Sequence, residues 1–273
     1  MAMAQRTWYA RLVILGILLA FIGVYVWQPG GTRVLEFVSD ALYLGAALVA
    51  AILALVASSR FDPGQPQRRA WFLLGTGLGL WAVAECIWMY FQIGAGREVP
   101  YPSVADVIWG IGYLPLILGM YLGHRSLGVR LSTRLRIVAM IVYAALLAAL
   151  AAWLVAPMCG DLPAGSWAEA VVGSFYLIGN LTLAFIATLS LVVVWDGLIG
   201  RPWLAITIGM LLFALSDTAF AYEAWVGQYA VGGNGISGMI DVVYLGAYLS
   251  IALGTYRQAT LSLADVPQAP ASP

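Results

Sequence analysis

The stretch DVIWGIGYL at residues 106–114 is written again, with small changes, as DVVYLGAYL at residues 241–249. Each copy places an aspartate at the start of an apolar run, an aromatic residue three positions later and a tyrosine seven positions later. The likeness extends upstream, where GLGLWAVAECIWMY at 77–90 aligns with GMLLFALSDTAFAY at 209–222. Two halves of the chain therefore share one pattern, and that pattern predicts the fold.

The composition places this repeated pattern in a membrane. Hydrophobic residues make up 62% of the 273 residues and charged residues only 10%, which no ordinary soluble domain shows. Apolar runs of about the length needed to cross a bilayer alternate with turn-forming segments rich in Gly, Pro, Asn and Asp. The runs predict eight transmembrane helices, at about 10–27, 36–58, 70–93, 103–123, 135–156, 168–195, 203–226 and 237–257.

Four predicted spans in each half give the repeat its geometry. The segment DALYLGAAL at 40–48 aligns with GSFYLIGNL at 173–181, so the likeness covers three spans of each half. Because four is even, both halves cross the membrane in the same sense, as a parallel repeat about an axis along the membrane normal. We expect an all-α polytopic membrane protein with a first four-helix repeat at 1–134, a second at 135–258 and a disordered tail at 259–273.

The arginines are distributed unevenly between the two sides. Only Arg33 and Arg97 fall on the side that holds the loops after the odd-numbered spans, and the other 11 fall on the opposite side with both termini. Cytoplasmic loops carry such an excess of basic residues. We expect a multi-pass protein of a bacterial inner membrane with both termini in the cytoplasm.

Several functional classes conflict with the residues present. None of the 13 cationic residues is a lysine, so a retinal Schiff base cannot form. The single His124 cannot give bis-histidine haem ligation, and Cys86 and Cys159 have no metal-site spacing. With zero net charge and no basic tail, nucleic acid is not an expected partner. We expect no cofactor and no metal ion.

Two carboxyl groups inside the apolar runs are the leading functional candidates. Glu85 and Asp217 align in the repeat, and each lies well inside its span, where an ionised carboxylate costs at least roughly 2.5 to 3.5 kcal/mol. Helical spacing puts Trp81 and Trp88 on the face of Glu85. An acid flanked by aromatic residues in each half is typical of a pocket wall.

Other candidates leave two interpretations open. Asp106, Asp241 and Asp40 are expected near the starts of their helices, where a carboxylate either caps the helix, as in a capping box of the SVAD segment, or rings a pocket entrance. Tyr113 and Tyr248 either pack helices together or supply ring faces to a ligand. Asn180, a lone polar residue inside its span, is a candidate for a hydrogen bond between helices.

One stretch resembles a known type of membrane region. REVPYPSVADVIWGIGYLPLILGM at 97–120, preceded by LWAVAECIWMY, is similar to the membrane-embedded sensory region found ahead of cyclic-di-GMP (GGDEF, EAL) and histidine-kinase output domains in bacteria. The resemblance implies a sensor. In those proteins the output domain follows the last helix, so here a separate signalling protein at the cytoplasmic face is the expected partner.

A second resemblance points to an enzyme. GMLLFALSDTAFAYEAW, followed by YLGAYLSIALG, is similar to a helix pair of the lysoplasmalogenase-like YhhN family, whose members hydrolyse the vinyl-ether bond of lysoplasmalogens. The resemblance implies that Asp217 is the family aspartate and Glu85 its first-half counterpart, with glutamate in place of the usual aspartate. Paired carboxylates can supply the general acid and base that this cleavage needs.

From these patterns we expect an outward-opening pocket between the halves that binds a small amphiphile or a cation. Glu85 and Asp217 set its charge, Asp40, Asp106 and Asp241 ring its entrance, and Trp88, Tyr113 and Tyr248 offer ring faces. Lipid hydrolysis is the alternative. A transporter, and an assembly subunit or homo-oligomer joined by the small-residue runs at 144–152 and 45–57, remain further possibilities. Membrane lipid is an expected partner in any of these cases.

Overall fold

The computed structural model describes residues 3–96, 100–128, 131–161, 167–195, 200–232 and 235–261, and its regular secondary structure there is all helical. Its α-helices are α1 Met3–Trp27, α2 Thr32–Ser59, α3 Pro66–Met89, α4 Val104–Ser126, α5 Thr133–Leu150, α6 Ala156–Asp161, α7 Trp167–Val194, α8 Gly200–Trp225 and α9 Gly235–Thr260. The π-helical segments η1 Tyr90–Gly94 and η2 Ala151–Val155 continue α3 and α5.

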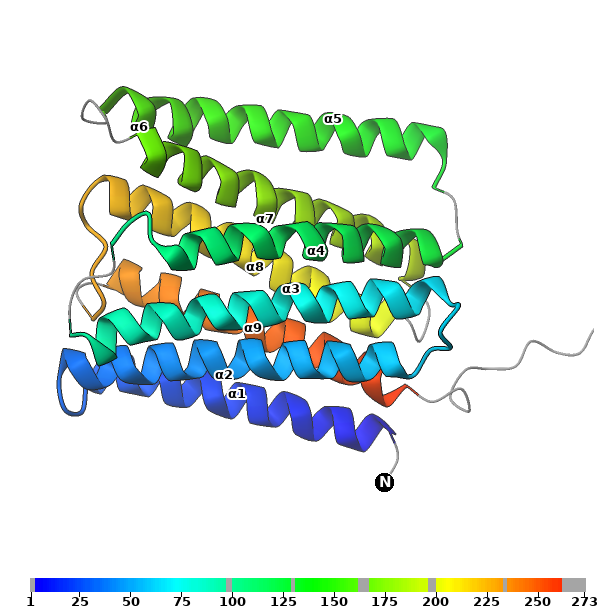
Figure 1. The fold of residues 1–273 in the computed structure, drawn as a ribbon, viewed down its shortest axis with the longest axis horizontal. Helices are drawn as coiled ribbons and strands as arrows, with labels where there is room; N and C mark the ends of the chain where they lie inside the picture. Colours follow the sequence, from blue (N-terminus) through cyan, green and yellow to red (C-terminus); the bar gives the residue numbers. More distant parts are fainter. Residues whose placement is uncertain are drawn as a thin grey trace, which may run out of the picture.

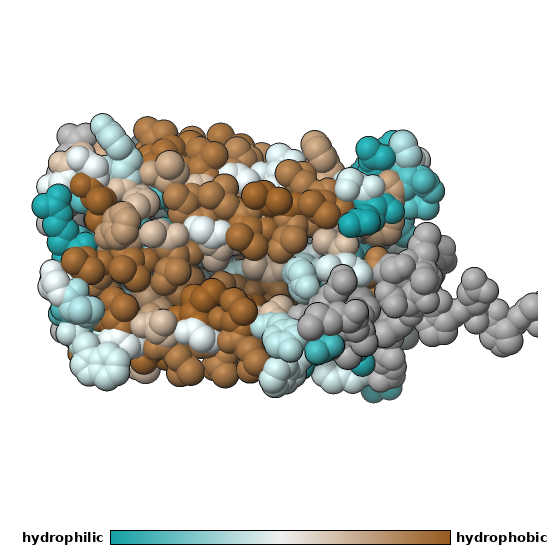
Figure 2. Space-filling model, turned by 90° about the horizontal axis from the view of Figure 1, so that it is seen from below, coloured by the Kyte–Doolittle hydropathy of each residue, from teal (hydrophilic) through white to brown (hydrophobic). Residues whose placement is uncertain are grey.

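Over the described part of the chain, eight helical spans are long and apolar enough to cross a membrane, with α5, η2 and α6 forming one of them. The predicted class of all-α polytopic membrane protein is confirmed. Figure 2 shows the apolar band across the middle of the molecule and the polar residues at its two ends. Of the tail predicted at 259–273, residues 262–273 lie outside the described residues.

Six helices make the core of the bundle. Each helix of this core contacts the next one in the order α2, α3, α4, α7, α8 and α9, and α9 closes the ring by contacting α2. The helices lie side by side and roughly antiparallel to their chain neighbours (Figure 1). The contact of α2 with α9 and that of α4 with α7 both join the two halves and are equivalent in the repeat. This pairing is the one that a parallel four-helix repeat predicts.

Glycines at equivalent positions set the helix spacing. A Cβ atom on Gly77 would lie 2.5 Å from Leu116 Cγ and 3.0 Å from the Gly112 carbonyl oxygen. A Cβ atom on Gly209 would lie 2.6 Å from Ile251 Cγ1 and 2.8 Å from a main-chain oxygen of α9. Small residues allow such close approach between membrane helices, so α3 packs on α4 as α8 packs on α9.

The remaining long helices, α1 and α5, lie outside the six-helix core. They form the lower and upper edges of the bundle in Figure 1. Helix α1 packs on α9 and α2, while α5 packs on α7 and contributes no buried residue of its own. Their apolar side chains on the other faces therefore point toward lipid.

The two ends of the bundle differ in charge. The starts of α1, α3, α5 and α8 and the ends of α2, α4, α7 and α9 share one end, which we call the arginine-rich end (Figure 1). The opposite end holds Asp40, Asp106 and Asp241 and is called the acidic end.

Candidate functional site

Glu85 lies in the interior of the bundle and joins its two halves. Its side chain, on α3, is only 4% exposed. Its Oε1 atom accepts a hydrogen bond of 2.8 Å from the Tyr244 hydroxyl and one of 2.7 Å from the Tyr248 hydroxyl, both on α9. The expected inward direction of Glu85 is thus seen, and one carboxyl group satisfies two buried phenols.

Asp217 is linked to the other half of the chain indirectly, through Asn180. Its half-buried carboxyl group, on α8, accepts a hydrogen bond of 2.5 Å from Asn180 Nδ2. The Asn180 Oδ1 atom in turn accepts a bond of 2.9 Å from the Tyr113 hydroxyl on α4. The interhelical hydrogen bond predicted for Asn180 is present. Tyr113 and Tyr248, equivalent in the repeat, each serve the acid of the other half.

Aromatic rings form a floor one helical turn below the two acids, toward the arginine-rich end. Trp81 and Phe213 meet edge to face with centroids 5.3 Å apart, and Phe213 meets Tyr248 in the same way at 4.7 Å. All three side chains are buried. Trp81 and Phe213 each lie one turn before an acid on the same helix, so their contact places Glu85 and Asp217 on facing sides of α3 and α8. The two acids therefore converge on a region that is closed below by rings.

Asp106 caps the start of its helix, which is the structural one of its two predicted roles. Ser103 is the N-cap of α4, and its main-chain N–H and its hydroxyl both donate to Asp106 Oδ2, at 2.6 and 2.8 Å. Asp106 Oδ1 accepts a bond of 2.7 Å from the Tyr176 hydroxyl on α7. The predicted capping box is confirmed, and both carboxylate oxygens are held by protein groups.

Asp241, the repeat counterpart of Asp106, is used differently. The expectation that it lies in the first turn of its helix is wrong, because α9 begins at Gly235 and Asp241 is one turn further in. Its carboxyl group accepts hydrogen bonds from the hydroxyls of Tyr25 and, at 2.8 Å, Tyr229. Burial and the nearby Asp241 carboxylate raise the pKa of Tyr229 far above its usual range, so this phenol remains a donor.

A serine-to-glycine difference explains why the two aspartates diverge. The position equivalent to Ser103 holds Gly238, so Asp241 has no hydroxyl at that point to cap against. A Cβ atom on Gly238 would lie 3.0 Å from the ring of Tyr25. The glycine therefore makes room for Tyr25 of α1, which reaches the Asp241 carboxyl group.

Asp40 carries a buried carboxyl oxygen without a hydrogen-bond partner among the described residues, as does Glu223 near the end of α8. The expectation of a position near the helix start is wrong, since α2 begins at Thr32 and Asp40 lies two turns inside it. Its side chain is 5% exposed, and its Oδ2 atom is buried with no hydrogen-bond partner among the described residues. The Asp40 carboxyl group interacts electrostatically with those of Glu85, Glu36 and Asp241. Its repeat counterpart is Gly173, so this acid belongs to one half only.

The rings beside Asp40 and Asp241 were only partly anticipated. Tyr43, one turn beyond Asp40, donates to the Asp241 main-chain oxygen at 3.2 Å and meets the Tyr244 ring at 5.0 Å. Tyr25, Tyr229 and Tyr244 were not predicted as site residues. The repeat did contain a signal for Tyr43 and Tyr244, because each of them aligns with an aromatic residue in the other half. Trp88 lies apart from this group, half-buried, where its Nε1 donates to Gln92 and its ring tilts against Trp109.

The fold and these contacts define a class, a polytopic helical membrane protein with carboxyl groups and tyrosines buried between its halves. No protein-family model matches the chain, and no curated protein or solved structure matches it. Among the described residues, no group of three or more His, Cys, Asp or Glu side chains is placed to hold a metal ion.

Proposed function

We propose that the protein is a sensor-type membrane receptor that binds a small organic cation, or the cationic head of an amphiphile, at the acidic end. The binding site, called the Asp40 site, is formed by the carboxyl groups of Asp40, Glu85 and Asp241 and the rings of Tyr43 and Tyr244. These residues come from α2, α3 and α9, so both halves contribute. Asp217 and Tyr113 stabilise the second half of the same interior.

The unpartnered oxygen of Asp40 is the observation that carries this proposal. Buried polar atoms are almost always hydrogen-bonded, and leaving one unpaired costs about 1–3 kcal/mol or more for a charged group. Here the unpaired atom is an acid placed among three further acids, which raises the cost. A bound cation offsets the crowding of acids by its charge, and an N–H or O–H group on it, such as the hydroxyl of choline, supplies the missing hydrogen bond.

Aromatic rings favour an organic cation as the ligand. Phe21, Tyr43 and Tyr244 form a chain of edge-to-face contacts beside Asp40, with centroid distances of 6.1 and 5.0 Å. Ring faces attract ammonium groups, and recognition of quaternary ammonium compounds commonly combines rings with acids. The second half lacks this combination because Gly173 stands in the place of Asp40 and Asp106 is engaged in its capping box.

Orientation and signalling follow from the same proposal. In this proposal the arginine-rich end faces the cytoplasm of a bacterial inner membrane, because cytoplasmic loops carry an excess of basic residues, and the Asp40 site lies near the outer face. Since α9 contacts α1, α2 and α8, a ligand held between α2, α3 and α9 is positioned to shift α9. A separate protein at the arginine-rich end would then receive the signal.

Substitution of Asp40 tests the binding proposal. In purified protein, choline is the probe, and titration calorimetry measures its affinity. We expect Asp40→Asn to weaken choline binding by about tenfold or more, because a charge-assisted contact is worth roughly 1.5–3 kcal/mol. Asp161→Asn removes an exposed acid at the same end and serves as the matched control with unchanged affinity. Equal choline affinity in Asp40→Asn and the wild type would refute the proposal.

Lipid hydrolysis is the second proposal, favoured by the position of Glu85 and Asp217, each one turn above the contacting rings of Trp81 and Phe213. Paired carboxyl groups in one interior can divide the roles of general acid and general base. If it is correct, purified protein releases an aldehyde from a lysoplasmalogen, and Asp217→Asn reduces that rate by at least about 100-fold. Absence of aldehyde release by the wild-type protein would eliminate this activity.

A further inference from the structure

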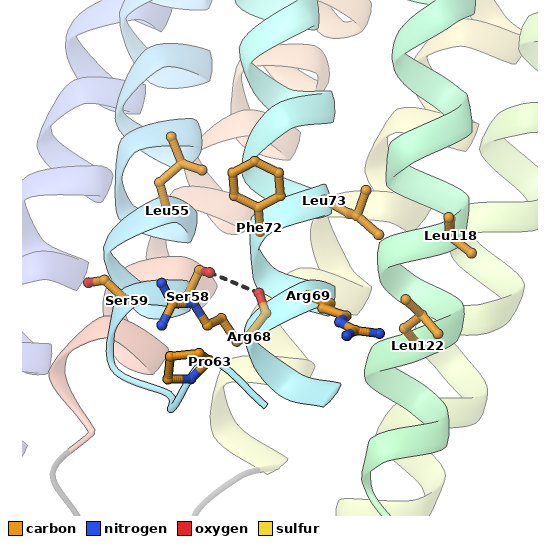
Figure 3. A pocket seen from close by; sticks show the side chains of 10 residues that line it. All are labelled: Leu55, Ser58, Ser59, Pro63, Arg68, Arg69, Phe72, Leu73, Leu118 and Leu122. Atoms are coloured by element: carbon orange, nitrogen blue, oxygen red, sulfur yellow. Dashed lines mark hydrogen bonds between the residues drawn. The ribbon is translucent and has the colours of Figure 1, made fainter. Parts of the chain in front are cut away.

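A groove lies at the arginine-rich end, on the opposite side of the aromatic floor from the Asp40 site. It has a volume of about 660 Å³ and crosses the first turns of α3 between the last turns of α2 and α4. Figure 3 shows polar side chains at its lower end and apolar side chains above them. The groove thus changes from charged to apolar along the direction of the membrane normal.

Two arginines flank α3 at the charged end. In Figure 3 the side chain of Arg68 extends toward α2, beside Ser58, and that of Arg69 extends toward α4. The Ser58 hydroxyl donates to the Arg68 main-chain oxygen at 2.8 Å, and Arg68 Nη1 donates to the Phe61 oxygen at 3.4 Å. These bonds hold the α2 side of the groove in place. A guanidinium has five N–H groups, so the bond to the Phe61 oxygen leaves donors for a ligand.

The apolar end of the groove faces lipid. Phe72 is 55% exposed, Leu118 48% and Leu55 41%, and they come from α3, α4 and α2 respectively. In Figure 3 the Phe72 ring lies above the arginines, with Leu55 on one side and Leu118 on the other. A molecule with an anionic head and two apolar chains matches this division, whereas a free anion would use only its lower end.

We propose that this groove binds one anionic phospholipid, with its head group over the first turn of α3, which Arg68 and Arg69 flank on either side, and its acyl chains along Leu55, Phe72 and Leu118. Basic pockets between transmembrane helices are a recurrent mode of anionic headgroup recognition. Guanidinium groups bind phosphate oxygens through paired N–H donors. Two arginines also repel the positive group of a zwitterionic head, which favours an anionic phospholipid. The bound lipid ties α2, α3 and α4 of the first half together at this end.

In the second half, a buried arginine side chain occupies the position equivalent to this groove. Leu122, in the groove, corresponds to Arg257, which is buried and donates from Nη1 to the Arg201 main-chain oxygen at 3.0 Å. Arg69 corresponds to Arg201, whose side chain is exposed at the same end. Arg201 is therefore a matched control for charge at this end of the bundle.

Native mass spectrometry of the purified full chain tests the proposal with three probes: phosphatidylglycerol, phosphatidylcholine with the same acyl chains, and glycerol phosphate. We expect the wild type to bind one phosphatidylglycerol about tenfold or more tightly than phosphatidylcholine. We expect the double variant Arg68→Gln/Arg69→Gln to lose this preference and Arg201→Gln to keep it. Glycerol phosphate should not compete, since it lacks the chains that contact the apolar end.

A second variant keeps the test decisive if the arginine variant fails to fold. Leu118→Trp leaves every charge in place and obstructs the apolar end, and it should reduce the binding of phosphatidylglycerol by about tenfold. Equal binding of both lipids by the wild type, or equal loss in Arg201→Gln, would overturn the proposal, as would full competition by glycerol phosphate. Choline binding at the Asp40 site should be unchanged in Arg68→Gln/Arg69→Gln, which separates the two proposals.

Discussion

Gly209→Ala is expected to destabilise the protein by about 1–3 kcal/mol, the usual cost of overpacking a well-packed contact. The added methyl group would lie 2.6 Å from Ile251 Cγ1 and 2.8 Å from the Ala247 carbonyl oxygen. A main-chain oxygen cannot move away without shifting α9, so the α8 and α9 helices must separate. Thermal unfolding in detergent, followed by circular dichroism, measures the change.

The control is the same substitution at a glycine with open space. Gly79 lies on α3 only two residues after Gly77, and no heavy atom lies within 4 Å of the place that an added methyl group would take. There, alanine removes the conformational freedom of glycine without a clash and should stabilise the helix by up to about 1 kcal/mol. If Gly209→Ala and Gly79→Ala shift the unfolding temperature in the same direction, the close contact between α8 and α9 is incorrect.

The arrangement of the helices was largely predictable from the sequence, because hydrophobic length and repeat spacing are properties of the chain itself. Aligning residue 106 with 241 already pairs Gly119 with Gly254, and a Cβ atom on either would lie 2.9 Å from a main-chain oxygen of the preceding helix. Helix starts were less predictable. Helix α2 begins at Thr32, before the span predicted at 36–58, and α9 begins at Gly235, before the span predicted at 237–257, so Asp40 and Asp241 lie deeper in their helices than expected.

The candidate site was predictable in its acids and less so in their partners. Glu85 and Asp217 are recognisable because an acid inside an apolar run is costly and must face the interior. Their partners depend on helices that are far apart in the chain, as with Glu85 and Tyr244, which are 159 residues apart. The three-dimensional packing of the helices determines that Glu85 on α3 meets two tyrosines of α9 directly. The packing of α7 against α4 and α8 likewise determines that Asp217 reaches Tyr113 through Asn180.

Substitutions of Glu85 should separate the role of its charge from that of its hydrogen bonds. Glu85→Gln retains an oxygen that can accept from Tyr244 and Tyr248, whereas Glu85→Leu keeps a similar volume and removes the acceptor that both hydroxyls share. A buried hydroxyl left without a partner costs about 1–3 kcal/mol, so Glu85→Leu should be less stable than Glu85→Gln by roughly 1–6 kcal/mol, depending on whether one or both hydroxyls lose their partner. Chemical unfolding in mixed micelles compares the two variants.

The decisive comparison adds Tyr244→Phe and Tyr248→Phe to Glu85→Leu. Replacing both sides of a buried hydrogen bond by apolar groups of the same shape is nearly neutral, so the triple variant should recover most of the lost stability. Because Glu85 belongs to the first half and the tyrosines to the second, this cycle measures the free energy with which one polar contact joins the two halves. A triple variant no more stable than Glu85→Leu would mean that the hydroxyls find other partners, and the acid could not then be what holds α9 against α3.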